Sequence, residues 1–168
     1  IRAFRARGEE LGLGDSLAFL GEVDAINLRR RERMVQLTKE SLGGSLAGKR
    51  VAVLGLAFKP DSDDVRDSPA LDVASRLVAE GALVVATDPE AVETSRRVQP
   101  NLSYVATPEE AAAGADAVLV LTEWKQYREL APSDLAGAAG QVILDGRNCL
   151  DRELWRRAGW LYRSLGRP

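Results

Sequence analysis

Two loops of this sequence carry the cationic side chains best suited to hold an anion. The first, residues 55–69, contains Lys59 and Arg66, and the second, residues 144–149, contains Arg147 directly after a glycine. Lysine acts as a point charge and arginine as a two-pronged donor, and both suit phosphate or sugar oxygens. A lone arginine in a turn is usually a solvated surface charge. Arg147 is therefore a candidate binding residue only if both loops lie at the same edge of a sheet. On that condition, we predict an anion site built from side chains.

The first loop lacks the glycines of a dinucleotide-binding loop. A Gly-x-Gly-x-x-Gly loop brings backbone N–H groups against a pyrophosphate. Here Gly55 is the one glycine of the loop, and the bulky Phe58 follows it. Binding through the backbone is therefore not expected, and the side chains must supply the charge.

Three acidic residues, Asp61, Asp63 and Asp64, lie between the two cations of the first loop. Their carboxylates offer oxygen ligands for Mg²⁺. The favoured interpretation is that they pair with the neighbouring cations or cap the helix expected from Pro69. We therefore predict no metal site.

The chain offers no convincing catalytic residue. Cys149 is its one cysteine, no histidine exists anywhere, and no other base stands beside the thiol to activate it. A phosphoacceptor domain would need an acidic pair directly after the first strand, whereas nine residues separate Leu54 from Asp64. We therefore expect binding without catalysis from these residues.

The composition is that of a globular protein. Hydrophobic residues make up 45% and charged residues 29% of 168 positions, the net charge is -2 and no apolar run is long enough to cross a membrane. Neither nucleic acid nor a membrane is an expected partner. The single cysteine favours the cytoplasm. The chain begins with Ile1, and we expect it to be cut from a longer protein.

The first 46 residues contain no β-like run and predict two helices. The first helix is expected to end at Gly12 and Gly14. The second is expected to begin at a polar cap, Asp15 or Ser16, to run to about Leu42 and to end at Gly43 and Gly44. So long a helix beside a compact domain usually packs on another domain or subunit.

Residues 47–168 alternate short apolar runs with helical segments and predict a doubly wound, mostly parallel α/β sheet. The expected strands are 51–54, 83–86, 117–121, 142–144 and 160–162. The expected helices are 69–80, 89–97, 107–113 and 151–157. Ligands of such sheets bind beyond the carboxyl ends of the strands, where both cationic loops fall.

Several of these segments together resemble the UDP-glucose/GDP-mannose dehydrogenase family. The resemblance rests on residues 55–70 (GLAFKPDSDDVRDSPA) with 87–89 (TDP), 122–124 (TEW), 145–148 (DGRN) and 23–27 (VDAIN). It implies that residues 1–46 form a helical dimerisation segment of a homodimer. It also implies that residues 47–168 form a Rossmann-like UDP-binding domain. An N-terminal NAD-binding domain would precede them in the parent protein.

The resemblance further implies the activity of the parent and roles for five residues. Family members oxidise the sugar C6 alcohol to a carboxylate by two NAD-dependent steps, on a catalytic cysteine in a motif that would precede Ile1. Catalytic residues are therefore expected outside this chain, which alone should be inactive. Phe58, Lys59 and Arg147 match positions that contact the nucleotide sugar, and Arg66 matches one facing NAD.

The arginine run at residues 29–33 has two interpretations. A charge run on a helix is usually a solvated face, but the family implies that Arg31 enters the substrate site of a partner subunit. The family often has Gln at the position of Arg30, so the alignment that assigns this role to Arg31 is less secure. UDP-glucose is the favoured substrate, with UDP-N-acetylmannosamine or GDP-mannose as alternatives. A non-catalytic binding or dimerisation module is the alternative from another class.

Overall fold

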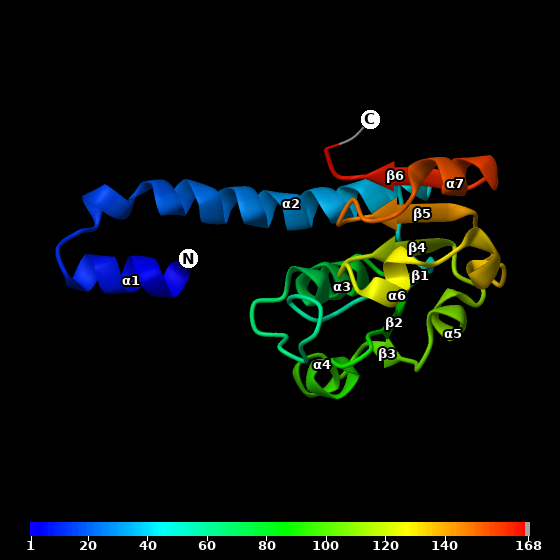
Figure 1. Ribbon diagram of the computed structural model, residues 1–168, viewed down its shortest axis with the longest axis horizontal. Coiled ribbons are helices and arrows are strands. Elements are labelled where there is room, and N and C mark those ends of the chain that lie inside the picture. The colour runs from blue at the N-terminus through cyan, green and yellow to red at the C-terminus, as the bar shows by residue number, and fades with distance from the viewer. Residues whose placement is uncertain (167–168) are drawn as a thin grey trace.

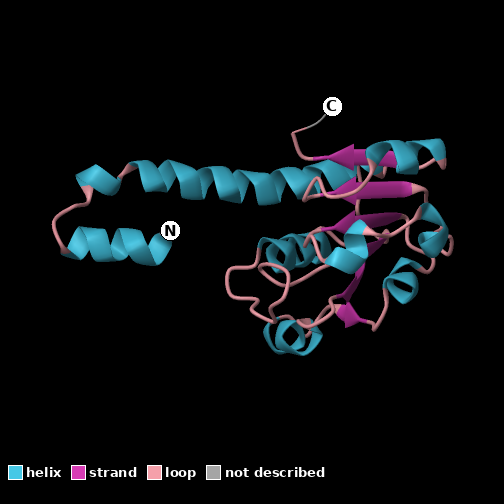
Figure 2. Cartoon of the chain, in the orientation of Figure 1, coloured by secondary structure: helices cyan, strands magenta, loops and turns pink. Residues whose placement is uncertain are grey.

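The molecule consists of a helical arm and a compact α/β unit joined by one long helix (Figures 1 and 2). The computed structural model describes residues 1–166, with the side chain of Arg2 excepted. The arm contains α1 (Arg2–Glu10), the 3-10 turn η1 (Asp15–Leu17) and the first half of α2 (Phe19–Ser41). The second half of α2 lies against the sheet. The last two residues of the predicted domain 47–168 lie outside the described residues.

The α/β unit is built on a six-stranded sheet in which every pair of neighbouring strands is parallel. Its strands are β1 (Arg50–Leu54), β2 (Leu83–Thr87), β3 (Ser103–Tyr104), β4 (Ala117–Val120), β5 (Val142–Asp145) and β6 (Leu161–Ser164). The strand order is β3-β2-β1-β4-β5-β6, so the direction of winding reverses between β1 and β4. The predicted doubly wound parallel fold is confirmed.

Short helices connect the strands, and side chains cap three of them. These helices are α3 (Pro69–Ala79), α4 (Val92–Val98), α5 (Pro108–Ala112), α6 (Lys125–Arg128), η2 (Pro132–Leu135) and α7 (Arg152–Arg157). The side chains of Ser68, Thr107 and Asp151 accept backbone N–H groups at the starts of α3, α5 and α7. Proline occupies the first turn of α3 and α5, where its missing N–H costs nothing.

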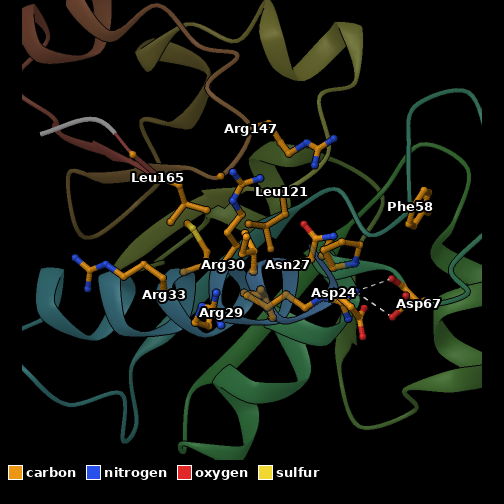
Figure 3. A pocket seen from close by; sticks show the side chains of 18 of the residues that line it. Asp24, Asn27, Arg29, Arg30, Arg33, Phe58, Asp67, Leu121, Arg147 and Leu165 are labelled. Atoms are coloured by element: carbon orange, nitrogen blue, oxygen red, sulfur yellow. Dashed lines mark hydrogen bonds and ion pairs between the residues drawn. The ribbon is translucent and has the colours of Figure 1, made fainter. Parts of the chain in front are cut away.

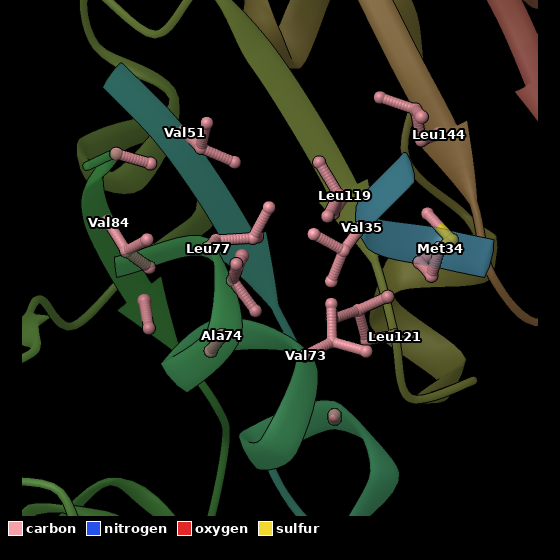
Figure 4. Close-up of a cluster of buried hydrophobic side chains, with 14 of the residues drawn as sticks. Met34, Val35, Val51, Val73, Ala74, Leu77, Val84, Leu119, Leu121 and Leu144 are labelled. Atoms are coloured by element: carbon pink, nitrogen blue, oxygen red, sulfur yellow. The ribbon is translucent and has the colours of Figure 1, made fainter. Parts of the chain in front are cut away.

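Two apolar cores cover the two faces of the sheet. On one face α2 and α3 pack against the strands through Met34, Val35, Val73 and Leu77 (Figure 4). On the other face α5, α6 and α7 contribute alanines, Tyr127 and Trp155. The second half of α2 therefore belongs to the core of the α/β unit.

The start of the long helix differs from its prediction, and its end does not. Neither Asp15 nor Ser16 caps α2; both belong to η1, and the N-cap of α2 is Ala18, without a side-chain hydrogen bond. The predicted cap was wrong because Gly14 and Ala18 both stay in the right-handed helical region, leaving no extended residue to cap. The end is as predicted: α2 stops at Ser41, and Gly43 follows with φ 82°.

Several short elements were not predicted from the sequence. β3 is only two residues long, α6 is a single turn after β4, and η1 and η2 are 3-10 turns of three and four residues. None of them is long enough to produce a recognisable hydrophobic period. Within residues 1–166, none of the helices combines the length and apolar character needed to cross a membrane.

Candidate functional site

An open groove of about 1010 Å³ runs between α2 and the loops that follow β1 and β5 (Figure 3). Phe58 and Arg147 line it from the two loops, and α2 contributes Arg29, Arg30, Arg31 and Arg33. Its apolar lining includes Met34, Val73, Leu121 and Leu165. The structure thus brings Phe58, Arg31 and Arg147 together from three distant segments. Lys59 and Arg66 do not line this groove.

The backbone of the β1–α3 loop is held by its own hydrogen bonds. The Ser68 hydroxyl donates to the carbonyl oxygen of Leu56 at 2.6 Å, and the Phe58 N–H donates to the carbonyl oxygen of Asp64 at 2.8 Å. The Phe58 side chain is left 49% exposed. Lys59 beside it is also exposed, and no ion pair of Lys59 is found among the described residues. This loop therefore presents a half-exposed aromatic ring and an exposed cation.

Arg66 pairs with Asp64 on the outer side of the same loop. Its Nε and Nη2 donate to the two carboxylate oxygens of Asp64 at 2.9 and 2.8 Å. The hydrogen bonds from Arg66 lower the pKa of Asp64 to about 2. The predicted pairing of loop acids with loop cations is confirmed for this pair. In the described part of the chain, no three His, Cys, Asp or Glu side chains gather as metal ligands.

Arg147 is already bound to a carboxylate of the same molecule. Its Nε and Nη2 donate to Oε2 and Oε1 of Glu123 at 2.5 and 2.9 Å. The hydrogen bond with Arg147 lowers the pKa of Glu123, and the same bond raises the pKa of Arg147. Both side chains stay about a third exposed. An anionic ligand of Arg147 must therefore share it with Glu123 or displace Glu123.

A buried carboxylate fixes the loop that carries Arg147. Asp145, at the end of β5, is fully buried and accepts from the Leu150 N–H at 2.8 Å, the Arg147 N–H at 3.0 Å and the Tyr162 hydroxyl at 2.9 Å. Buried carboxylates are tolerated when their oxygens are satisfied in this way. The position of the Arg147 backbone is therefore set by the core of the sheet.

Cys149 lies against the same carboxylate and is not activated. Its thiol contacts Oδ1 of Asp145 at 3.8 Å. Burial, helped by the charge of Asp145, raises the pKa of Cys149 to about 12. A thiol with so high a pKa holds its proton near neutral pH and is a poor nucleophile.

Arg31 ties α2 to the α/β unit of its own chain. Its side chain is 10% exposed, and Nη2 donates to the carbonyl oxygen and to Oδ1 of Asp67 at 3.2 and 3.0 Å. Nη1 reaches Asp72 on α3 at 3.5 Å. Asp67 has a left-handed backbone, with φ 53°, at the end of the loop that carries Phe58. These contacts hold Arg31 as a buried part of the groove lining, turned toward Asp67 and α3, whereas Arg29 and Arg30 are exposed there.

Sequence reasoning missed the pairing of Glu123 with Arg147. Glu123 appeared only within the Thr-Glu-Trp segment, with no role of its own. The available signal was its place in the loop that follows β4, because β4 lies between β1 and β5, the strands that carry the two cationic loops. The arginines at positions 29, 30 and 33 were noticed as a charge run, but their placement on the groove needed the helix to be docked.

The crevice between β1 and β4 does not fit a dinucleotide such as NAD. Gly55 has φ 97°, and a Cβ there would lie 2.6 Å from Cβ and from the backbone N of Thr122. The Thr122 hydroxyl also donates to the carbonyl oxygen of Ala57 at 2.9 Å. The ends of β1 and β4 are therefore packed directly on each other, where a dinucleotide site needs space.

Fold and site together define a doubly wound, Rossmann-like domain whose groove is lined by cations and apolar side chains. The profile of the UDP-glucose/GDP-mannose dehydrogenase family, UDP binding domain, matches residues 52–152. This stretch begins in β1 and ends at the start of α7, so it contains both loops of the groove. The chain belongs to this family.

Individual relatives agree with that assignment. The chain is 39% identical over 145 residues to a UDP-glucose 6-dehydrogenase of Rhizobium meliloti, covering 86% of this chain and 33% of the relative. A UDP-glucose dehydrogenase structure from Pyrobaculum islandicum has a TM-score of 0.75 and 39% identity over 88% of this chain and 32% of its own. A UDP-N-acetyl-mannosamine dehydrogenase from Staphylococcus aureus has a TM-score of 0.75 with 26% identity, covering 92% of this chain and 34% of its own. The chain spans about a third of the length of these relatives.

Proposed function

We propose that this chain is the nucleotide-sugar-binding part of a UDP-glucose 6-dehydrogenase. The parent enzyme would convert UDP-glucose and two NAD⁺ to UDP-glucuronate and two NADH. The observation that carries the proposal is the groove in which Phe58 and Arg147, from two loops of the family-matched region, face the arginines of α2. The uracil ring of UDP suits the apolar lining, and its diphosphate suits the cations.

In this proposal the loop residues divide the ligand between them. Arg147 binds the diphosphate within the groove, and Phe58 packs on the nucleotide sugar. Lys59 does not line the groove but is exposed beside Phe58, and we propose that it reaches the diphosphate from there. Arg66 is exposed and turned outward on its ion pair with Asp64, a position from which it can meet a phosphate of NAD held by another domain. The ion pairs of Arg31 favour a role in holding the loop at Asp67 over a role in a second subunit. The reacting groups lie outside this chain, which we expect to be inactive alone.

The helical arm supports a homodimer as the working form. Among residues 1–166, thirteen large hydrophobic residues are exposed, and eight of them lie in the first 28 positions, including Phe4, Phe19 and Ile26. So many exposed apolar side chains on one segment mark an interaction surface. A second copy, together with an N-terminal NAD-binding domain of the parent, would cover them. We place this dimeric enzyme in the cytoplasm.

The substrate alternatives differ in the base and in the sugar. UDP-N-acetylmannosamine is supported by the 26% identical structure that acts on a UDP sugar by its name. A GDP-mannose dehydrogenase structure from Pseudomonas aeruginosa, at 22% identity, supports the shared fold alone. UDP-glucose is favoured because the Rhizobium meliloti and Pyrobaculum islandicum relatives are both 39% identical.

Calorimetric titration of the purified protein with UDP-glucose, UDP-N-acetylmannosamine and GDP-mannose tests the proposal. We expect UDP-glucose to bind most tightly and GDP-mannose to give no heat. Lys59→Ala should weaken binding, whereas Lys49→Ala, at the opposite end of β1, should not. Binding of GDP-mannose without UDP-glucose would overturn the substrate. Loss of affinity in both lysine variants alike would point to a diffuse charge effect instead of a site.

A further inference from the structure

One buried carboxylate occupies the crevice where a sheet of this strand order would hold a nucleotide phosphate. Asp88 directly follows β2 and is 3% exposed. Its Oδ2 accepts from the backbone N–H groups of Leu56 at 2.7 Å and Ala57 at 3.0 Å. These are the first two residues after Gly55, at the carboxyl end of β1. In dinucleotide-binding domains the backbone N–H groups after the first strand face the pyrophosphate.

The same carboxylate is saturated from its other sides. Nε1 of Trp124 donates to Oδ2 at 3.1 Å, closing the crevice from the end of β4. Oδ1 accepts from the N–H groups of Glu90 and Ala91 at 3.0 and 2.8 Å. Asp88 thus receives five hydrogen bonds from three segments. Each has a charged acceptor, the stronger class of protein hydrogen bond.

The position of Asp88 in the fold makes this arrangement informative. In a dinucleotide-binding sheet, the acidic residue at the end of the second strand points outward to a ribose hydroxyl. Here it is turned inward onto the first loop. Asp88 therefore fills the position of a phosphate, and its carboxylate is no longer available to accept a hydrogen bond from a ribose hydroxyl.

We propose that Asp88 stands in place of a ligand phosphate and, together with the contact of Gly55 with Thr122, excludes nucleotides from the β1–β4 crevice. The backbone N–H groups that would attract a phosphate are bound by a carboxylate of the chain itself. An anionic ligand is left with the groove beside α2, where the cations are side chains. The assignment of the ligand to that groove rests on the proposed function, but the role of Asp88 does not.

Acetate rescue of an Asp88 variant tests the proposal. Asp88→Gly removes the carboxylate and leaves a space of its shape beside the N–H groups of Leu56 and Ala57. Acetate supplies the missing group, so the midpoint of thermal unfolding of the variant should rise with acetate relative to chloride at equal ionic strength. The unsubstituted protein, whose crevice is filled by Asp88, should show no such difference. Equal responses of the unsubstituted protein and the variant would overturn the proposal.

Asp116 provides the matched control. Its Oδ2 accepts the Arg50 N–H at 2.9 Å at the amino end of β1, where the side chain is 35% exposed and no phosphate crevice exists. Asp116→Gly should be destabilised without acetate rescue. Rescue of both variants would show a general effect of acetate and contradict the proposal.

Hydrogen exchange keeps the test decisive if Asp88→Gly does not fold. Asp88→Asn keeps an acceptor oxygen but loses the charge. The amides of Leu56 and Ala57 should then exchange about tenfold faster than in the parent, with the amides at Arg147 and Leu150 unchanged. Unchanged exchange at Leu56 and Ala57 would mean that the charge of Asp88 does not hold this loop. The separate nucleotide titration then still decides the proposed function.

Discussion

The two loops at the site have the same kind of backbone support but offer their cations differently. Asp88 fixes the loop after β1, and Asp145 fixes the loop after β5, each as a buried carboxylate that accepts backbone N–H groups. Lys59 is exposed on the first loop, whereas Arg147 on the second is bound to Glu123. Backbone position is therefore preorganised in both loops, but only one cation is ready for a ligand.

The largest expected effect comes from removing the support of the second loop. Asp145→Ala leaves the Tyr162 hydroxyl and two backbone N–H groups without their acceptor in the core. We expect the free energy of unfolding to fall by about 2–4 kcal/mol, measured by urea denaturation. Asp151→Ala, which removes only the exposed cap of α7, should cost about 1 kcal/mol. Equal costs would mean that Asp145 does not organise its loop.

Ligand affinity should depend on the cations of both loops. Lys59→Ala and Arg147→Ala should each weaken UDP-glucose binding by about 1–3 kcal/mol, because each removes charge-assisted bonds to a diphosphate. Isothermal titration of the parent enzyme measures this. Arg97→Ala on α4, an exposed position away from the groove, is the control. An unchanged affinity in either loop variant would make that cation a plain surface charge.

Removing the internal competitor of Arg147 should have a smaller effect of opposite sign. Glu123→Gln frees Arg147 and should tighten UDP-glucose binding by about 0.2–1 kcal/mol, the usual worth of an exposed ion pair. The gain should shrink as salt rises. Weaker binding in this variant would show instead that Glu123 holds Arg147 in its binding position.

The same pair makes a pH-dependent contribution to stability. Arg147 lowers the pKa of Glu123, so the contribution is fully present above the ordinary glutamate pKa of about 4.3 and is lost as pH falls through the lowered value. The difference in the free energy of unfolding between the unsubstituted protein and Glu123→Gln should therefore be constant near neutral pH and shrink in acid. A difference that instead grows in acid would contradict the pairing.

The smallest expected effect concerns the outer ion pair of the first loop. Arg66→Ala removes the donors that hold the pKa of Asp64 at about 2, and this pKa should return toward its ordinary value of 3.8. The Asp64 carboxyl resonance, followed through a pH titration by NMR, reports it. Global stability should not change measurably, since both groups are exposed. An Asp64 that titrates near its ordinary value in the parent would contradict the pair.

The fold was predictable from the sequence because its signals are local and repeated. Continuous apolar runs such as residues 51–54 and 117–121 marked buried parallel strands, and the alternation with helices gave the doubly wound sheet. The glycines after Ser41 marked the end of α2. The cap at Asp15 or Ser16 was mispredicted because a 3-10 turn runs into the helix without an extended residue.

The site was predictable only in outline. The strand-end rule placed both cationic loops at one edge, and the structure puts Phe58 and Arg147 on one groove. The strand-end rule could not reveal that Glu123 binds Arg147 or that Arg31 binds Asp67. Both ion pairs depend on side-chain conformations in segments that are distant in sequence. Asp88 was visible only as part of a motif, since its role depends on which way it points.

Chemical-shift mapping of UDP on the ¹⁵N-labelled protein tests most directly whether the two loops and α2 form one nucleotide site. We expect the amides of Phe58, Lys59 and Arg147 to shift together along one saturation curve, joined by those of Arg29 and Arg30 on α2. The amides of Leu56 and Ala57, bound by Asp88, should move least within the first loop. Shifts confined to one loop, or centred on the β1–β4 crevice, would contradict the account.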